Sequence, residues 1–399
     1  MSHKRLAVVV MNGISGDSRV QKIAQSASEG GYITLLLGIG SPFLHEHLSP
    51  TLTYKVVEHR KAARKRFANK IFAFFKFFGI DPKLGVKSYL ENLTQLRILE
   101  LIPELVDFAP NLIHANDPDT LRLAFEYKLN YPDTKIVYDA HEYILGAVRP
   151  SMGWNDFMSG EEGAFISDVD GIITVSETIA SSLTKNYELD SFPHVIRNLP
   201  SSSDNKVGKD IVRDCNLNPG DNLGVYLGNI TSARGLDVIP NSLFRISNLH
   251  IALVTKTSAE LDSLISEAMR LNVADRLHVL PYVSHDLITC YIKSAKFGIA
   301  PYANEINHNM SLPSKFYEYL VAGIPIVSSE LPESSKFLNV NKVGVLFQAN
   351  NEQSFCDAVM MVLETREELL REIKNLDMTD FTWESQEQKL LDIYKEILA

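Results

Sequence analysis

The chain has 399 residues, a formal net charge of −10, 45% hydrophobic residues and 22% charged residues. This length suits two domains of roughly 180 residues each, and the composition excludes wholesale disorder as well as collagen-like and coiled-coil architectures. The acidic balance argues against nucleic acid as a partner, and no apolar run approaches the roughly 20 residues that span a bilayer. We therefore expect a cytoplasmic protein without a signal peptide, whose three widely spaced cysteines stay reduced.

Short apolar, β-rich runs alternate with helical patterns along the chain. Most runs are continuous rather than alternating, which is typical of strands buried on both faces. Repeated strand–helix units predict two doubly wound, Rossmann-like α/β domains with parallel sheets that face a central cleft. The predicted strands are 6–10, 34–37, 54–57, 112–114, 135–138, 171–175 and 194–196 in the first half, and 223–227, 250–254, 277–280, 297–300, 324–327 and 343–346 in the second.

Two turn-rich stretches separate the halves. Residues 199–208 read LPSSSDNKVG and residues 218–222 read NPGDN, and neither has strand or helix periodicity. We predict a first domain over 1–200, a linker over 201–221, a second domain over 222–376 and a C-terminal helix over 377–399.

The first candidate ligand loop follows the first strand and reads MNGISGDSRV. Gly13 and Gly16 would let a ligand approach the backbone, and Asp17 or Ser18 is the expected N-cap of the next helix, whose start favours an anion. The dinucleotide fingerprint is not met, because its third glycine and its ribose-binding acid are missing. A tight strand-to-helix turn is the alternative interpretation.

A second candidate follows the strand at 135–138, where the sequence continues DAHEY. Asp139, His141 and Glu142 are expected at the carboxyl end of the sheet, where ligands bind. A histidine flanked by two carboxylates at that place indicates function more than packing. Asp117, at the end of the preceding strand, is expected to cap the next helix.

Two Asp-x-Asp tripeptides, 117–119 and 168–170, invite a metal-binding interpretation. We assign both to helix ends and turns, because neither has a third oxygen ligand nearby in sequence. No metal site is therefore predicted.

The second half contains two more specific motifs. Residues 227–235 read LGNITSARG, in which Arg234 and Gly235 are expected to open a helix where a cation could reach a phosphate. Residues 311–327 read SLPSKFYEYLVAGIPIV, with Lys315 in the first turn of a helix and Glu318 one turn later. A cation in a first turn opposes the helix dipole, so its presence indicates an anionic ligand such as a diphosphate.

In their joint order and spacing, these motifs resemble the GT-B-fold nucleotide-sugar glycosyltransferases, specifically the retaining family-4 type, over nearly all of the chain. The matching residues are His141, Ser176 and Asn198 in the first domain, Gly228, Arg234, Gly235, Glu318, Gly323 and Pro325 in the second, and the terminal segment from 381 to 384 onward.

The resemblance implies a role for each matched position. Glu318 would hydrogen-bond the donor ribose, Arg234 with Lys315 would bind the diphosphate, and His141 would touch the donor sugar. These four are the expected catalytic residues. The other residues expected to bind the donor are Gly13 and Gly16 in a flexible loop, Tyr282 and Val283 against the base, and Gly228, Asn229, Lys256, Met310, Ser311 and Leu312.

Two positions depart from the family pattern. Met310 stands where the family often has an acid, eight positions before Glu318, and Asn229 stands where an arginine commonly follows the glycine. Glu305 or the polar residues 307–309 are candidates to replace the acid. Lys315, and less directly Lys256, could restore the missing positive charge.

The resemblance implies metal-independent transfer of a sugar, with retention, from a UDP- or GDP-sugar to a hydroxyl of a glycan or lipid-linked acceptor. The second domain would bind the donor and the first the acceptor. A nucleotide-sugar 2-epimerase on the same fold is one alternative, and a non-catalytic glycosyltransferase-like subunit is another, favoured by Met310 and Asn229. The sugar, the base, the acceptor and the oligomeric state stay open.

Residues 60–79, RKAARKRFANKIFAFFKFFG, contain seven Lys/Arg, no acid and six phenylalanines. On a helix, their apolar surface is wider than packing on one side of a sheet requires. One interpretation is a peripheral anchor on an anionic membrane surface, where each cation adds about 1 kcal/mol. The other is an ordinary first-domain helix packed under residues 84–105.

Overall fold

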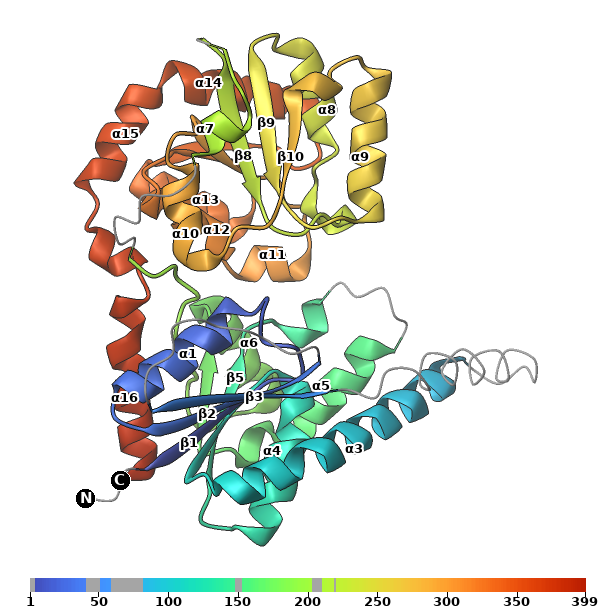
Figure 1. The fold of residues 1–399 in the computed structure, drawn as a ribbon, viewed down its shortest axis with the longest axis vertical. Helices are drawn as coiled ribbons and strands as arrows, with labels where there is room; N and C mark the ends of the chain where they lie inside the picture. Colours follow the sequence, from blue (N-terminus) through green and yellow to red (C-terminus); the bar gives the residue numbers. More distant parts are fainter. Residues whose placement is uncertain (1–3, 41–50, 59–81, 148–152, 203–209, 219) are drawn as a thin grey trace. The chain divides into compact units, whose positions relative to one another are not determined.

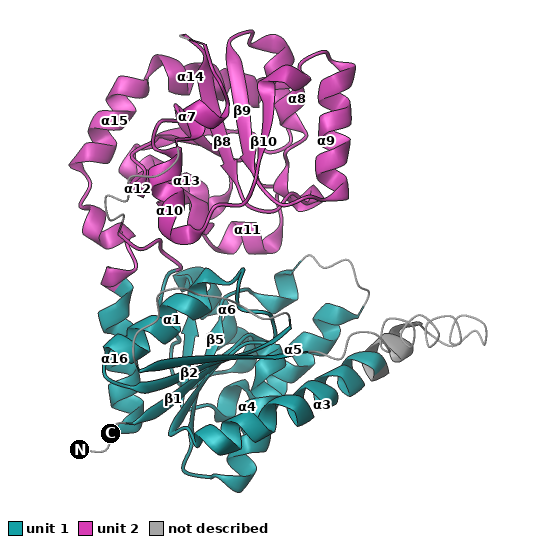
Figure 2. Cartoon of the chain, viewed as in Figure 1, with its two compact units in different colours: residues 1–197, 386–399 teal, residues 198–385 magenta. Residues whose placement is uncertain are grey.

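The computed structural model describes the chain except for residues 1–3, 41–50, 59–81, 148–152, 203–209 and 219. Two compact units make up the fold: unit 1 is Met1–Arg197 with Gln386–Ala399, and unit 2 is Asn198–Ser385 (Figure 2). The basic segment at 60–79 lies outside the described residues. Among the residues that are described, no helix is both long enough and apolar enough to cross a membrane.

Unit 1 is built on a parallel sheet with the strand order β3-β2-β1-β4-β5-β6-β7. Strand β1 pairs with β2 on one side and β4 on the other, so the chain order reverses at that point. The strands are β1 (Arg5–Val9), β2 (Ile33–Gly40), β3 (Leu52–Glu58), β4 (Leu112–Asn116), β5 (Lys135–Ala140), β6 (Gly171–Thr174) and β7 (His194–Val195). All seven lie at the apolar runs predicted from sequence.

Helices cover both faces of this sheet. Helices α3, α4 and α5 pack against one another on one face, whereas α1 and α16 lie on the other (Figure 1). Asp17 is the N-cap of α1 and accepts a hydrogen bond from the backbone N–H of Val20, at 3.3 Å. The helices are α1 (Ser18–Glu29), α3 (Pro82–Phe108), α4 (Pro118–Asn130), α5 (Trp154–Phe165), α6 (Glu177–Tyr187) and α16 (Glu384–Leu398), with short 3-10 turns η1 (Ile144–Gly146) and η2 (Ile166–Asp168).

Unit 2 repeats the architecture with six parallel strands in the order β10-β9-β8-β11-β12-β13. The strands are β8 (Asn222–Leu227), β9 (Leu249–Val254), β10 (Leu277–Leu280), β11 (Phe297–Ala300), β12 (Ile326–Ser329) and β13 (Gly344–Phe347). Strand β12 begins two residues later than predicted, because the Ile324 N–H donates to the Tyr319 carbonyl and so belongs to the end of the preceding helix. The predicted pair of doubly wound parallel sheets is confirmed.

The helices of unit 2 also divide between the two faces of the sheet. Helices α8, α9 and α14 share one apolar core with it, and α10, α12 and α13 share the other. The helices are α7 (Ile211–Asp214), α8 (Val238–Arg245), α9 (Ala259–Arg270), α10 (His285–Ile292), α11 (Ile306–Met310), α12 (Ser314–Val321), α13 (Pro332–Asn341), α14 (Glu352–Glu364) and α15 (Arg366–Asn375), with 3-10 turns η3 (Ser232–Arg234), η4 (Ala274–Arg276) and η5 (Met378–Phe381).

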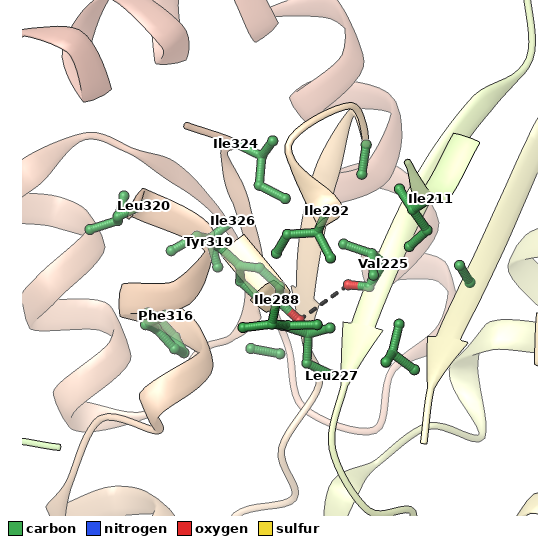
Figure 3. Close-up of a cluster of buried hydrophobic side chains, with 14 of the residues drawn as sticks. Ile211, Val225, Leu227, Ile288, Ile292, Phe316, Tyr319, Leu320, Ile324 and Ile326 are labelled. Atoms are coloured by element: carbon green, nitrogen blue, oxygen red, sulfur yellow. Dashed lines mark hydrogen bonds between the residues drawn. The ribbon is translucent and has the colours of Figure 1, made fainter. Parts of the chain in front are cut away.

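Tyr319 anchors α12 to the middle of the unit 2 sheet (Figure 3). Its buried hydroxyl lies 3.1 Å from the carbonyl oxygen of Val225 on β8 and 2.9 Å from that of Ile299 on β11, and it donates a hydrogen bond there. A Cβ atom at Gly298 would lie 2.3 Å from the tyrosine ring, so only glycine lets the ring lie against β11. This packing fixes the first turns of α12, which carry Lys315 and Glu318.

Candidate functional site

In unit 2, the strand order reverses between β8 and β11, and open parallel sheets bind ligands at the carboxyl ends of such neighbouring strands. Gly228 follows β8 and has a φ of 109°, which favours glycine. Tyr302 follows β11 after Pro301. Asn229 and Arg234 lie in the segment that follows Gly228, and Tyr302 lies in the loop after β11.

Gly235 joins the loop after β8 to the loop after β11. A Cβ atom there would lie 2.1 Å from the carbonyl oxygen of Pro301, and the Ala303 N–H donates to the Ala233 carbonyl at 3.1 Å. This contact places Arg234 beside Tyr302, with the guanidinium carbon 5.0 Å from the ring centroid. Arg234 lies in the 3-10 turn η3, so the prediction that it opens a helix is wrong: α8 begins only at Val238.

Lys315 is a buried cation enclosed by aromatic rings. Its side chain is 6% exposed, and Nζ lies 3.8 Å from the ring centroid of Tyr226 and 4.9 Å from that of Tyr302. The faces of the two rings attract the ammonium group. Burial, and then the nearby charge of Arg234, lower the pKa of Lys315 well below its ordinary value, against the opposing effect of Glu318. Burial likewise raises the pKa of Tyr302 to about 12.

Glu318 lies one helical turn after Lys315 and begins a row of polar groups. Its Oε1 is 3.6 Å from Nδ1 of His285, the first residue of α10. The ring of Tyr282 lies edge-on to His285, with ring centroids 5.9 Å apart, and is 45% exposed. Nζ of Lys256 lies 5.4 Å from the Tyr282 ring centroid. The row thus places a carboxylate and an accessible aromatic ring on neighbouring elements.

The remaining predicted donor residues lie around this cluster. Met310 ends α11 and is 9% exposed, and Ser311 and Leu312 connect it to α12. Nearby, Asn309 has a buried Oδ1 atom that has no hydrogen-bond partner within the described ranges. Asn229 is exposed, and Val283 lies beside Tyr282 after β10. The structure gives position 310 an apolar side chain next to a buried amide oxygen.

In unit 1, the loop containing Gly13 and Gly16 is fixed by short contacts at its base. The side-chain amide of Asn12 accepts from the Ile14 N–H at 2.7 Å and donates to Asp17 Oδ2 at 2.9 Å. The Asn12 carbonyl accepts from Ile39 on β2. Asp17, rather than Ser18, is the cap of α1, as one of the two alternatives predicted.

Asp139 does not face a ligand, and the expectation that it would is wrong. Its carboxylate is fully buried and accepts two hydrogen bonds from Arg19, at 2.7 and 2.8 Å, and one from His114 at 3.3 Å. Burial alone would raise the pKa of Asp139, but the Arg19 guanidinium and His114 hold it well below its usual range. The hydroxyl of Tyr394 on α16 lies 2.7 Å from His114 Nδ1 and completes this buried chain.

His141, two residues after Asp139, lies beside Asp117. Its Nε2 is 3.4 Å from Asp117 Oδ2, and its buried Nδ1 has no hydrogen-bond partner among the described residues. Burial lowers the pKa of His141, but the neighbouring carboxylates, Asp117 first, raise it above its ordinary value overall. Burial raises the pKa of Asp117 to about 7 despite His141.

Asp117 also corrects a sequence-based expectation. It occupies the N-cap position of α4, but its side chain makes no capping hydrogen bond. This absence could not be predicted from the sequence, because an aspartate before Pro118 has the pattern of an N-cap. Tyr226 was missed because it lies inside an apolar strand, and Tyr302 because it lies in a loop without periodicity.

The comparisons with known proteins agree with this architecture. Residues 222–365 match the family described as Glycosyl transferases group 1, and no curated protein matches the chain in sequence. One similar solved structure is sucrose-phosphate synthase from Thermosynechococcus elongatus, with a TM-score of 0.74 and 13% sequence identity over 99% of each chain. A second is Anabaena HepE in complex with UDP-glucose, with a TM-score of 0.69 and 12% identity over 99% of this chain and 100% of HepE. A third is WaaG, a glycosyltransferase involved in lipopolysaccharide biosynthesis, with a TM-score of 0.62 and 11% identity over 97% of this chain and 99% of WaaG.

At these identities, the structural likeness shows the fold. The family match adds the activity, and it covers β8 to α14, the segment that carries Arg234, Lys315 and Glu318. The chain therefore has the GT-B fold, and its residues 222–365 match the group 1 glycosyl transferases, enzymes that transfer glycosyl groups.

Proposed function

We propose that unit 2 binds the diphosphate of a nucleotide-sugar donor through Arg234 and Lys315. The observation that carries the proposal is the pair of cations around one buried aromatic ring, that of Tyr302. Two like charges held close together, of which that of Lys315 is buried, are stabilised by an anion, and a diphosphate supplies more than one negative charge. Glu318 then accepts hydrogen bonds from the donor ribose, and the exposed ring of Tyr282 stacks on the base.

The proposed reaction is glycosyl transfer with retention, in the manner of the family-4 enzymes. The bond between the anomeric carbon and the diphosphate oxygen breaks, a bond from that carbon to an acceptor hydroxyl oxygen forms, and the hydroxyl proton goes to the departing phosphate. Arg234 and Lys315 stabilise the negative charge that develops on the leaving group. In unit 1, His141 contacts the glycosyl group, and the unit binds the acceptor.

The donor is proposed to be a UDP- or GDP-sugar, with no metal required. HepE was solved with UDP-glucose, and a nucleotide carried by such a structural relative is a reasonable first probe. The proposed acceptor is a hydroxyl of a polysaccharide or glycolipid. The basic segment 60–79 favours a lipid-linked acceptor if it binds an anionic surface.

The binding site is tested with nucleotides alone. We expect Arg234→Ala and Glu318→Ala each to weaken binding of UDP or GDP by at least about tenfold, because a charge-assisted hydrogen bond contributes about 1.5–3 kcal/mol. The measurement is titration calorimetry on the full chain. Arg245→Ala removes an exposed arginine at the end of α8 and is the matched control. Unchanged affinity in both site variants would contradict the assignment.

Turnover identifies the donor and the reaction. The full chain is incubated with a panel of UDP-, GDP- and ADP-sugars, with and without glycan acceptors, and products are read by mass spectrometry. A glycosylated acceptor supports the proposal. An epimerised nucleotide sugar released without acceptor would instead indicate the 2-epimerase reaction, and binding without any turnover would contradict the transferase assignment.

A further inference from the structure

Asp117 makes no capping hydrogen bond and has a strained backbone, and both features cost stability. It occupies the N-cap of α4, where an aspartate normally accepts a hydrogen bond from the helix, yet its side chain makes none. Its backbone has φ 66° and ψ 158°, a conformation that side-chain-bearing residues rarely adopt. Backbone strain of this kind persists only where the surroundings enforce it, and it gathers at functional sites.

The surroundings of Asp117 do enforce its conformation. Its N–H donates to the Asp139 carbonyl at 3.1 Å, and its own carbonyl accepts from the backbone N–H and the hydroxyl of Thr120, at 3.1 and 2.8 Å. With the backbone fixed in this way, the carboxylate lies 3.4 Å from Nε2 of His141. The strained conformation therefore brings the carboxylate of Asp117 next to the ring of His141.

His141 has one ring nitrogen occupied and one available. Nε2 faces Asp117, whereas Nδ1 is buried and lacks a hydrogen-bond partner in the described part of the chain. A buried polar atom without a partner costs free energy unless a ligand satisfies it. The other charged groups that act on the ring are Asp17 at the start of α1, Asp139 on β5 and Arg19 on α1.

We propose that Asp117 is a positioning residue for glycosyl transfer: it holds the Nε2 side of the His141 ring and so presents Nδ1 to an oxygen of the bound substrate. This inference rests on the proposed function for the role of His141 in transfer. The proposed contact between the Asp117 carboxylate and the His141 ring does not depend on a bound ligand. The first test therefore uses the ligand-free protein.

Nitrogen chemical shifts report the state of each ring nitrogen. The full chain is labelled with ¹⁵N-histidine, and the His141 signals are assigned by their loss in His141→Ala. We expect Asp117→Asn to shift the His141 Nε2 signal, because an amide replaces the carboxylate. Asp119→Asn, which removes an acid of α4 that pairs with Arg97 of α3, should leave the signal in place. His141 signals that are the same in wild type and Asp117→Asn would overturn the proposal.

A second variant separates positioning from stability. Glycine adopts the backbone conformation of residue 117 readily, so Asp117→Gly should melt no lower than the wild type. Its kcat with the donor and acceptor found in the panel should nevertheless fall by about 100-fold, because misplacing a reacting group by about 1 Å costs that much. The KM for the donor should change by less than about threefold, since the diphosphate is bound by unit 2.

The outcomes distinguish this inference from the proposed function. Loss of turnover in His141→Ala with full turnover in Asp117→Gly and Asp117→Asn would reject the positioning role and leave the function standing. Full turnover in His141→Ala would reject the part that His141 plays in the proposed function. A lower melting temperature in Asp117→Gly, with kcat unchanged, would show that Asp117 is structural.

Discussion

The surroundings of Lys315 disfavour the protonated, charged form of its side chain. The ammonium group is buried between the rings of Tyr226 and Tyr302, and the guanidinium of Arg234 lies on the second of these rings. Burial and Arg234 lower its pKa, so a smaller fraction of Lys315 carries a proton than on an exposed lysine. An arriving diphosphate reverses this balance, because an anion favours the charged form.

We therefore expect UDP or GDP to bind with net uptake of a proton. The pKa of Lys315 rises on binding, so uptake is greatest at a pH between its values in the free and the bound protein, and affinity falls as the pH rises through that range. The measurement is calorimetry at several pH values below the ordinary pKa of lysine, about 10.4, in two buffers of different ionisation enthalpy. Lys315→Arg keeps its charge and should abolish the difference. Equal heats in both buffers for the wild type would contradict the prediction.

At the scale of single residues, candidate site residues could be identified from the sequence when they lie next to the end of a predicted strand or helix. Arg234, Lys315 and Glu318 each lie near a boundary that turn and helix signals mark, so they could be proposed as candidates. Tyr302 and Tyr226 could not, because they meet Lys315 only when β8 and β11 become neighbours in the sheet. The expected roles of these residues come from the family resemblance, and the tyrosine rings that surround Lys315 are known only from the structure.

At the scale of elements, a line of three polar side chains crosses the amino-terminal side of the unit 2 sheet. Nδ1 of His250 on β9 lies 2.9 Å from Nε2 of His278 on β10, with the rings stacked, and Nε2 of His250 lies 3.5 Å from Asp221 Oδ2 just before β8. Burial lowers the pKa of both histidines, and His250 lowers the pKa of His278 further. The carboxylates of Asp221 and Asp275 oppose the lowering at His250, and Asp275 opposes it at His278. Arg276 also lowers the pKa of His250.

This pair should make unit 2 less stable in mild acid. In the unfolded chain, histidine takes up a proton near pH 6.5, whereas in the folded pair the pKa is lower and protonation needs a lower pH. The unfolded state therefore binds more protons, and the free energy of unfolding falls as the pH drops below about 6.5. The loss levels off once the folded pair protonates too. We expect His278→Asn to reduce the change in unfolding free energy between pH 7.5 and 5.5, measured by urea denaturation. His194→Asn, at an exposed position, is the control. An unchanged pH dependence in His278→Asn would contradict this.

The sequence predicted the elements well and their ends less well. All the strands in the described part of the chain were anticipated, because strands buried on both faces are continuous apolar runs between turn signals. The start of α8 and of β12 could not be predicted. Each depends on hydrogen bonds and close contacts between loops, such as that of Gly235 with Pro301, which are set by the packed fold rather than by local propensity.

At the scale of the whole molecule, the C-terminal helix α16 is part of unit 1 and carries a member of its buried polar chain. Tyr394 is fully buried, and its hydroxyl pairs with His114, which in turn contacts the Arg19–Asp139 ion pair. Leu391 of the same helix packs within van der Waals reach of Gly30 at the end of α1. The first 197 residues therefore lack part of their own core.

Tyr394→Phe should destabilise unit 1 by about 1–3 kcal/mol, because it leaves the buried His114 Nδ1 without its partner. The transition of unit 2 should not move, since none of these residues belongs to it. The measurement is denaturant unfolding followed by hydrogen exchange, which reports each unit separately. Lys395→Ala, on the exposed side of the same helix, is the control. A loss of protection in unit 2 instead of unit 1 would contradict the prediction.

The chain crosses from unit 1 to unit 2 and back again, and this order affects how the protein folds during its synthesis. Unit 2 is one continuous stretch, Asn198–Ser385, whereas unit 1 needs residues from both sides of it. Domains usually fold in the order in which they emerge from the ribosome. Here the unit that emerges first cannot complete its buried polar chain until Tyr394 has been synthesised. A chaperone that binds nascent chains would therefore meet unit 1 unfinished while unit 2 is already complete.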